Sequence, residues 1–227
     1  MTISVNDIDE MISDSIKAVR QGFKILKIKV GKDSRKDIER ITAIRQAVGS
    51  GIRLRIDANQ GWSPKEAIRM IRTLEDAGVD MELVEQPVSA YDFEGMKLVT
   101  AQVNTPILAD ESVFSTDDAI RLVQERAADM INIKLMKTGG IHEALKICAI
   151  AESFHVECMI GCMLESKIAV SAAAHLAAGK SIITRADLDG PLLCREDPYD
   201  GGPVYAGSRI IMNKANGIGI TGVPVFG

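Results

Sequence analysis

The sequence lacks the features that mark membrane, secreted and nucleic-acid-binding proteins. No apolar stretch approaches the length of a bilayer-spanning helix, and the start of the chain lacks the charged-then-apolar layout of a signal peptide. No long basic run is present, and a formal net charge of -4 at pH 7 disfavours binding to nucleic acid. We therefore expect neither a membrane nor a nucleic-acid partner, and no export.

Cysteine and histidine are both scarce. The four cysteines follow no CxxC pattern of paired metal ligands, and without an export signal they are expected to be reduced thiols of a cytoplasmic protein. Two of them, Cys148 and Cys158, are expected to be small apolar core residues. The histidines fall in or beside predicted helices and are expected to be structural; they are His142, His155 and His175.

What the sequence does contain is a repeated unit of a short apolar strand followed by an amphipathic helix. Strands are predicted at residues 2–5, 26–31, 52–57, 81–85, 105–110, 130–134, 157–160 and 182–187. Helices are predicted at 8–21, 93–102, 116–125, 141–154 and 166–178. Two more are predicted from their caps, one capped by Asp33 or Ser34 and ending before Gly49, and one starting at Ser63-Pro64. The strands recur at nearly even intervals, which is the pattern of a TIM-type α/β barrel.

The competing fold is an open doubly wound sheet. No GxGxxG motif follows the first strand, and evenly spaced units favour closure into a barrel. The sequence after Asp187 is rich in Gly and Pro, so the eighth helix is expected to be missing or degenerate, which gives a (β/α)7β architecture. A length of 227 residues and a hydrophobic fraction of 46% suit a single barrel of this kind.

The predicted strand at 26–31 carries two lysines among Ile, Leu and Val. The period of a strand places Lys27 and Lys29 on one face, with Ile28 and Val30 on the other. Taken alone, an edge strand with two solvated lysines is an equally good interpretation. Burial of both ammonium groups would require anionic partners, and other strands of the chain supply them.

The predicted C-terminal strand ends, where such barrels carry their functional groups, are rich in charge. In chain order they carry Lys29, Asp57, Glu85, Asp110, Lys134 and Asp187. A single acidic residue would most simply be a helix cap or a solvated carboxylate. Three carboxylates from consecutive strands would repel one another without a cation between them, and hard oxygen ligands suit Mg²⁺ better than zinc. The sequence therefore predicts a Mg²⁺ site formed by Asp57, Glu85 and Asp110.

The lysines on the second and sixth strands would stand on opposite sides of these acids. That arrangement suits a metal-bound substrate held between two bases, with the metal stabilising an enediolate formed when a proton leaves the carbon α to a carboxylate. One of Lys29 and Lys134 would remove the proton, and the other would return a proton to the opposite face. Lys27, on the same face as Lys29, is expected to lower the pKa of Lys29 by like-charge repulsion.

Five short motifs in a fixed order resemble those of a known enzyme family. They are Lys27-Ile28-Lys29, Asp57-Ala58-Asn59, Glu85-Gln86-Pro87, Asp110-Glu111-Ser112 and the run from Asn132 to Gly140. The set resembles the muconate-lactonizing subgroup of the enolase superfamily, from Thr2 to about Asp189. The resemblance implies that the three acids bind Mg²⁺, that Lys29 and Lys134 are the acid/base pair, and that Lys137 is a nearby support.

The eighth predicted strand ends in Asp187-Leu188-Asp189, which resembles the element by which dipeptide epimerases of this family hold the ammonium group of the substrate. Two carboxylates at one strand end are also a natural clamp for an α-amino group. Without the resemblance, the stretch would be interpreted simply as a turn. The resemblance further implies substrate contacts, which are those of Lys27, Cys162, Leu164 and Thr2.

The chain departs from the family at its beginning. Members of the family carry an α+β capping domain before the barrel, and here the sequence begins at the first barrel strand. We expect a barrel at 1–190, and a tail at 191–227 of the kind that packs against the capping domain in the family. The exposed barrel mouth would favour a homo-oligomer or a capping-domain partner.

The predicted function is therefore that of an isomerase, a Mg²⁺-dependent epimerase of dipeptides. A cycloisomerase or an o-succinylbenzoate synthase of the same subgroup is an alternative, although their substrates carry no α-ammonium for the two aspartates to bind. A barrel that keeps the fold and metal site but turns over little substrate is the other alternative.

Overall fold

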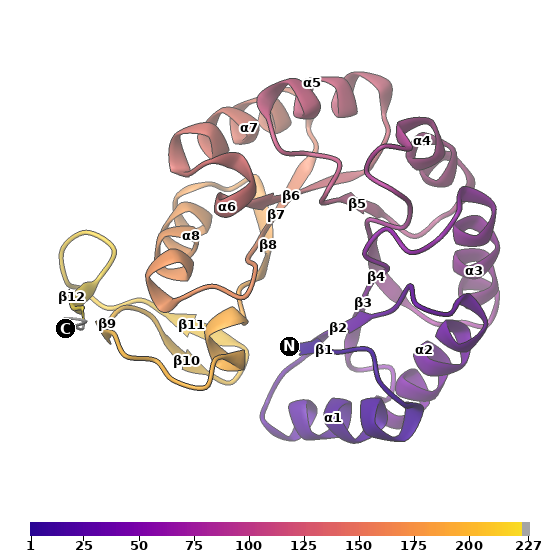
Figure 1. Cartoon of the computed structure of the whole chain (residues 1–227), viewed down its shortest axis with the longest axis horizontal. Coiled ribbons are helices and arrows are strands. Elements are labelled where there is room, and N and C mark those ends of the chain that lie inside the picture. Colours follow the sequence, from indigo (N-terminus) through magenta and orange to yellow (C-terminus); the bar gives the residue numbers. More distant parts are fainter. Residues whose placement is uncertain (224–227) are drawn as a thin grey trace.

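The computed structural model describes residues 1–223, in which parallel strands follow one another in chain order around a curled sheet, with helices on its outer side (Figure 1). The strands are β1 Thr2–Ile3, β2 Ile25–Lys29, β3 Arg53–Asp57, β4 Met81–Glu85, β5 Ile107–Ala109, β6 Met130–Lys134, β7 Glu157–Gly161 and β8 Ile183–Asp187. The helices are α1 Ile8–Arg20, α2 Ser34–Val48, α3 Pro64–Asp76, α4 Phe93–Gln102, α5 Thr116–Glu125, α6 Leu135–Thr138, α7 Ile141–Phe154 and α8 Lys167–Gly179. The predicted α/β barrel architecture is confirmed.

The two edges of the curled sheet, β1 and β8, meet without a backbone ladder between them in residues 1–223. Because β1 is only two residues long, it offers few backbone groups for such a ladder. Other contacts join the edges: Asp189 Oδ2 accepts a hydrogen bond from the Thr2 amide at 2.6 Å, and Lys27 on β2 forms an ion pair with Asp187. The barrel is thus completed at this seam by side-chain contacts.

Local sequence signals explain where the helices begin. Ser63 and Glu66 form the predicted capping box, with Pro64 in the first turn of α3. Asp33 accepts hydrogen bonds from the amides that open α2. Apolar residues at helical spacing then cover the outer face of the sheet, as those of α3 do: Ala67, Met70, Ile71 and Leu74. A smaller apolar cluster fills the inside of the barrel, made of Leu83, Leu108, Met130 and Met159.

Several element boundaries differ from the predicted ones. The strand predicted at 26–31 ends at Lys29, because Gly31 has a φ of 95° and turns the chain. β1 and β5 are shorter than predicted, and the short helix α6 was not predicted. The missing eighth helix is confirmed, since the 3₁₀ helix η1 Gly190–Leu193 follows β8 instead.

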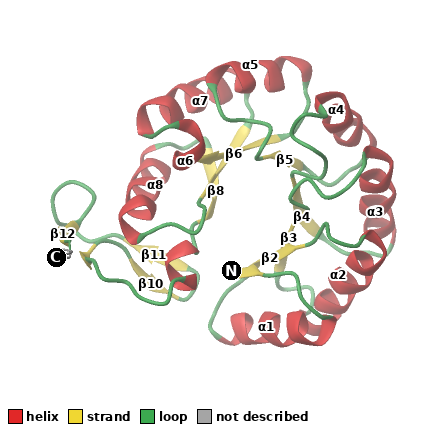
Figure 2. Ribbon diagram, in the orientation of Figure 1, coloured by secondary structure: helices red, strands yellow, loops and turns green. Residues whose placement is uncertain are grey.

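The tail forms two small antiparallel pairs beside the barrel (Figure 2). Its strands are β9 Asp200–Gly201, β10 Val204–Ala206, β11 Arg209–Ile211 and β12 Ile220–Gly222. Residues 224–227, the last of the predicted tail, lie outside the described residues. The described part contacts the barrel, as when the Tyr205 hydroxyl donates to the carbonyl of Leu188 at 2.7 Å. Packing against a capping domain stays a prediction.

Two further expectations concern the whole chain. Along residues 1–223, none of the helices has both the length and the apolar character needed to cross a bilayer. The cysteines are unpaired, and Cys148 and Cys158 are buried in the core as predicted. Burial raises the pKa of Cys148 to about 11, so the thiol stays protonated at neutral pH.

Candidate active site

A cavity of about 490 Å³ opens at the C-terminal ends of the strands. A volume of this order is typical of sites for small molecules. The predicted site residues that line it are Thr2, Lys27, Lys29, Asp110, Lys134, Cys162, Leu164, Asp187 and Asp189. Asp57 and Glu85 are fully buried, within reach of these lysines. The topology therefore brings the whole predicted set to one end of the barrel.

Lys29 stands on one side of the acids. It is paired in register with Asp57 of the neighbouring strand, and its Nζ lies 2.6 Å from Asp57 Oδ2 and 2.8 Å from Asn59 Oδ1. Ile28, between the two lysines, is fully buried in the main core. The common inward face predicted for Lys27 and Lys29 is confirmed.

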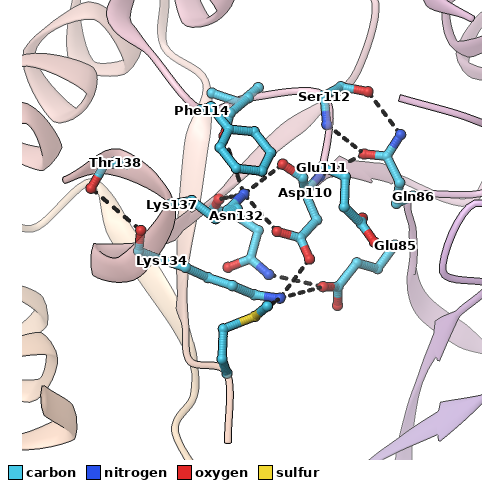
Figure 3. A network of polar contacts seen from close by, with 12 residues as sticks. Glu85, Gln86, Asp110, Glu111, Ser112, Phe114, Asn132, Lys134, Lys137 and Thr138 are labelled. Carbon is cyan, nitrogen blue, oxygen red and sulfur yellow. Dashed lines mark hydrogen bonds and ion pairs between the residues drawn. The ribbon is translucent and has the colours of Figure 1, made fainter. Parts of the chain in front are cut away.

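Lys134 stands on the opposite side, at the end of β6. Its Nζ lies 2.5 Å from Asp110 Oδ2 and 4.0 Å from Glu85 Oε1 (Figure 3). Burial by itself lowers the pKa of Lys134, but the charges of Asp110 and Glu85 outweigh burial and raise it. The ammonium form of Lys134 is therefore stabilised at neutral pH.

Lys137, one turn of α6 further on, braces the loop that follows β5. Its Nζ lies 2.6 Å from Asp110 Oδ1 and donates hydrogen bonds to the carbonyls of Asn132 and Val113 at 3.0 and 3.2 Å. Burial lowers its pKa against the opposing charge of Asp110. These contacts match a supporting position for Lys137.

The carboxylates at the centre of the site are buried and repel one another. Glu85 is fully buried, and burial together with the charges of Asp57 and Asp110 raises its pKa. Lys27 offsets part of this repulsion, because its Nζ lies 3.5 Å from both Asp57 Oδ2 and Glu85 Oε2. The charge of Lys27 is thereby balanced by these carboxylates. The predicted effect of Lys27 on Lys29 stays a prediction.

The donor set fits a hard divalent cation. Carboxylates from three neighbouring positions of the sheet supply only oxygen, and their mutual repulsion is what a dication would relieve. Among residues 1–223, however, the structure contains no group of three or more His, Cys, Asp or Glu side chains placed closely enough to hold a metal ion. Lysine ammonium groups lie among these carboxylates, with Lys27 between Asp57 and Glu85 and Lys134 between Glu85 and Asp110.

The end of β8 and the residues after it line the side of the cavity next to Lys27. Asp187 is buried and forms the ion pair with Lys27, whereas Asp189 is half-buried and holds the Thr2 amide. Cys162 is half-buried, and Leu164 is 69% exposed on the rim of the cavity. The two aspartates thus reach the same cavity as the lysines.

Sequence reasoning assigned no role to two buried amides. Asn132 donates from Nδ2 to Glu85 Oε1 at 2.9 Å, and Gln86 Oε1 accepts from the amides of Asp110 and Ser112 at 2.8 and 3.1 Å (Figure 3). Asn132 lies two positions before Lys134, so strand alternation was a signal that could have found it. Gln86 carries no such signal, because its φ of 36° takes it out of the strand pattern.

The three histidines, which were expected to be structural, lie away from this cavity. His142 lies in the first turn of α7 and His155 follows its last residue, both exposed, while His175 is half-buried in α8, where its ring contacts the Ser171 carbonyl. They are absent from the cavity lining, as expected for structural residues.

Comparison with known families settles the relationship. The model of the enolase C-terminal domain-like family matches residues 11–223. The chain belongs to this family. Among enolase-type relatives, the L-Ala-D/L-Glu epimerases of Clostridium acetobutylicum and Bacillus subtilis are 58% and 54% identical over 98% and 99% of this chain.

Solved structures agree with this placement in the enolase-like family. The substrate-liganded L-Ala-D/L-Glu epimerase from Bacillus subtilis matches with a TM-score of 0.97 at 54% identity, covering 99% of this chain and 63% of that one. The dipeptide epimerase from Enterococcus faecalis V583, complexed with Mg and L-Leu-L-Tyr, matches with a TM-score of 0.94 at 49% identity, covering 97% and 62%. The chain spans about 62% of the length of the curated relatives named above.

Proposed function

We propose that the chain carries the catalytic barrel of a Mg²⁺-dependent dipeptide epimerase. The observation that supports this most is the placement of Lys29 and Lys134 on opposite sides of the buried acids, each with its own carboxylate partner at 2.6 and 2.5 Å. The names of the relatives, which are epimerases acting on dipeptides, support the same reaction class.

Asp57, Glu85 and Asp110 would hold the Mg²⁺. When bound there, the ion would supply positive charge to the substrate carboxylate as negative charge develops on it. The oxygen-only donor set supports this assignment, as does the Enterococcus faecalis dipeptide epimerase, whose structure contains Mg together with a dipeptide.

The two lysines would perform a 1,1-proton transfer. One Nζ takes the proton from the carbon α to the carboxylate, breaking the C–H bond, and the electron pair spreads onto the carboxylate. The other Nζ, as an ammonium, gives a proton to the opposite face of the same carbon, which inverts it.

Asp187 and Asp189 would bind the α-ammonium of the dipeptide. Both line the cavity that the lysines share, Asp187 as the last residue of β8 and Asp189 two residues after it. Substrates of a cycloisomerase or an o-succinylbenzoate synthase carry no such group, so the aspartate pair favours the epimerase.

The reaction is tested by following α-proton exchange into D₂O across a dipeptide library, with Mg²⁺ and with a chelator. We expect Mg²⁺-dependent exchange and epimerisation at the C-terminal residue of the dipeptide. Exchange that is independent of Mg²⁺, or that is confined to substrates without an α-ammonium, would contradict the proposal.

The ammonium clamp is tested by Asp189→Asn, which removes the charge but keeps an oxygen that can accept from the Thr2 amide. We expect KM for the dipeptide to rise about tenfold, the loss of one charged contact, while an N-acetyl dipeptide is processed unchanged. Unchanged dipeptide turnover would show that Asp189 does not bind the ammonium group.

We further propose that a capping segment or a partner chain covers the barrel mouth. The rim of the cavity carries exposed apolar side chains, which are Phe114, Met136, Met163, Leu164 and Leu193, and the relatives are longer than this chain. If nothing covers the rim, the barrel would bind Mg²⁺ but turn over little substrate, because water would reach the site.

The unpaired cysteines fit a cytoplasmic location.

A further inference from the structure

Strand β8, which ends at Asp187 two residues before Asp189, is held by a ladder on one side only. β8 pairs with β7, whereas in residues 1–223 no ladder joins it to β1 on its other side. A strand end with one free edge has little to fix its position to within the fraction of an ångström that a binding site needs. Side-chain contacts therefore position the two carboxylates: Asp187 pairs with Lys27, Asp189 accepts from the Thr2 amide, and a further contact reaches β8 from across the barrel.

Arg55 on β3 makes such a contact from inside the barrel. Its Nη1 donates to the carbonyl of Ala186, directly before Asp187, at 3.0 Å, and its Nε lies 2.6 Å from Glu82 Oε2. The residue is only 3% exposed, so the guanidinium interacts with little screening by water. Arg55 is absent from the lining of the catalytic cavity, whereas Asp187 and Asp189 line it.

A β-bulge supplies the carboxylate that Arg55 needs. Leu54 pairs with Met81 and Arg55 with Leu83, so Glu82 is an extra residue on β4. The side chain of Glu82 is only 10% exposed and meets Arg55, Arg53 and Arg185. The bulge thus places a buried anion beside the buried guanidinium, which would otherwise be costly to bury.

We infer that Arg55 is a positioning residue for the end of β8, which it holds through Ala186 so that Asp187 and Asp189 face the substrate ammonium. Burial raises the pKa of Asp187, but the charge and hydrogen bond of Lys27, then the charge of the N-terminal ammonium and then that of Arg55 hold it below its ordinary value. The inference rests on the proposed ammonium clamp for its functional consequence, but its structural part stands separately.

The structural part is tested by hydrogen–deuterium exchange with Arg55→Gln and the matched control Arg53→Gln. Arg53 lies on the same strand and also contacts Glu82, at 3.2 Å, but its side chain is 62% exposed and no contact with β8 is found among the described residues. In Arg55→Gln we expect amides in a peptide spanning 183–190 to exchange about tenfold faster, as for a lost charged hydrogen bond, and no change in Arg53→Gln. Unchanged exchange in Arg55→Gln, or equal acceleration in both variants, would overturn the inference.

The functional part compares a dipeptide with its N-acetyl derivative. In Arg55→Gln we expect the preference in kcat/KM for the free dipeptide to fall about tenfold through KM, with kcat nearly unchanged. A fall in kcat with the preference intact would overturn the assignment to β8. A wild-type protein with no preference would refute the proposed clamp, while the exchange experiment still decides the structural part. Should Arg55→Gln fail to fold, Arg55→Lys keeps a charge for Glu82 but lacks the second nitrogen that reaches Ala186.

Discussion

At the scale of single residues, charge pairing organises the site. Lys29 contacts Asp57, Lys134 contacts Asp110, and Lys27 lies between Asp57 and Glu85. Each ammonium thereby stabilises a carboxylate whose burial would otherwise be unfavourable. A substrate that enters between the two outer lysines would meet one Nζ on each face.

Because the two lysines lie on opposite sides of the acids, we expect Lys29→Ala and Lys134→Ala to lose proton exchange from opposite stereoisomers of the substrate. Each variant keeps one base, so we expect epimerisation to fall by about 10³-fold or more, while α-proton exchange persists for one stereoisomer only, a different one in each variant. Exchange is followed by proton NMR in D₂O with both stereoisomers of one dipeptide. Lys32→Ala, an exposed lysine just after β2, serves as the control and should leave both rates unchanged.

Equal exchange of both stereoisomers in either variant would contradict a two-base mechanism. Loss of exchange for the same stereoisomer in both variants would place the two lysines on one face of the substrate, against their arrangement around the barrel.

At the scale of elements, the loops after β2 and β3 are locked together behind Lys29. The buried carboxylate of Asp37 accepts hydrogen bonds from the Gly31 amide at 2.9 Å and from Trp62 Nε1 at 3.2 Å. A Cβ built on Gly31 would lie 2.1 Å from the carbonyl oxygen of Ala58, so the two backbones approach too closely for any side chain there. This junction fixes the end of the lysine strand.

Gly31→Ala is therefore expected to destabilise the fold and to displace Lys29. The backbone at φ 95° is unfavourable for alanine, and the clash with Ala58 adds to it; together they cost about 3 kcal/mol or more. Gly78→Ala is the matched control, because Gly78 has a φ of 71° but nothing within 4 Å of its Cβ position. It should lose only about 1–2 kcal/mol in urea denaturation. Equal losses would show that the close approach does not matter.

At the scale of the whole molecule, a buried ionic network ties distant strands together beneath the site. Glu82 of β4 contacts Arg55 of the neighbouring strand β3 and Arg185 of the edge strand β8, so one carboxylate links three strands across the barrel. Burial raises the pKa of Glu82, but the hydrogen bond and charge of Arg55, with the charges of Arg53 and Arg185, outweigh it and hold the pKa below its ordinary value. The network stabilises the fold as long as Glu82 is ionised.

The sign of this shift predicts how the stability of Glu82→Gln depends on pH. At pH 7 we expect the variant to lose roughly 3 kcal/mol, as when one partner of a buried pair is removed. Because the folded pKa is lowered, that loss is fully present above the ordinary glutamate pKa and shrinks as pH falls through the lowered value. Urea titrations of both proteins between pH 7 and the acid limit of folding measure it.

Glu157→Gln is the control for this experiment. Glu157 also pairs with Arg185, but its side chain is 49% exposed, so its removal should cost less than about 1 kcal/mol. A stability loss in Glu82→Gln that did not vary with pH would contradict an ionised Glu82 in the folded state.

The sequence by itself determined the α/β fold, the order of strands and the residues at their C-terminal ends, because strand alternation, helix caps and apolar spacing are local signals. Lys27 and Lys29 were assigned to one inward face for this reason. The Mg²⁺ ligands and the acid/base roles were predicted from the charge at those ends and from a family resemblance, and they stay predictions.

Only the tertiary structure decided how charges meet across the barrel. That Lys27 lies between Asp57 and Glu85, that Glu82 leaves the strand pattern at a bulge to meet Arg55, and that β8 is held to β1 by Asp189 and the Thr2 amide are all consequences of curvature. These contacts join residues far apart in the chain, and no local pattern encodes them, because they depend on how the curled sheet brings its edges together.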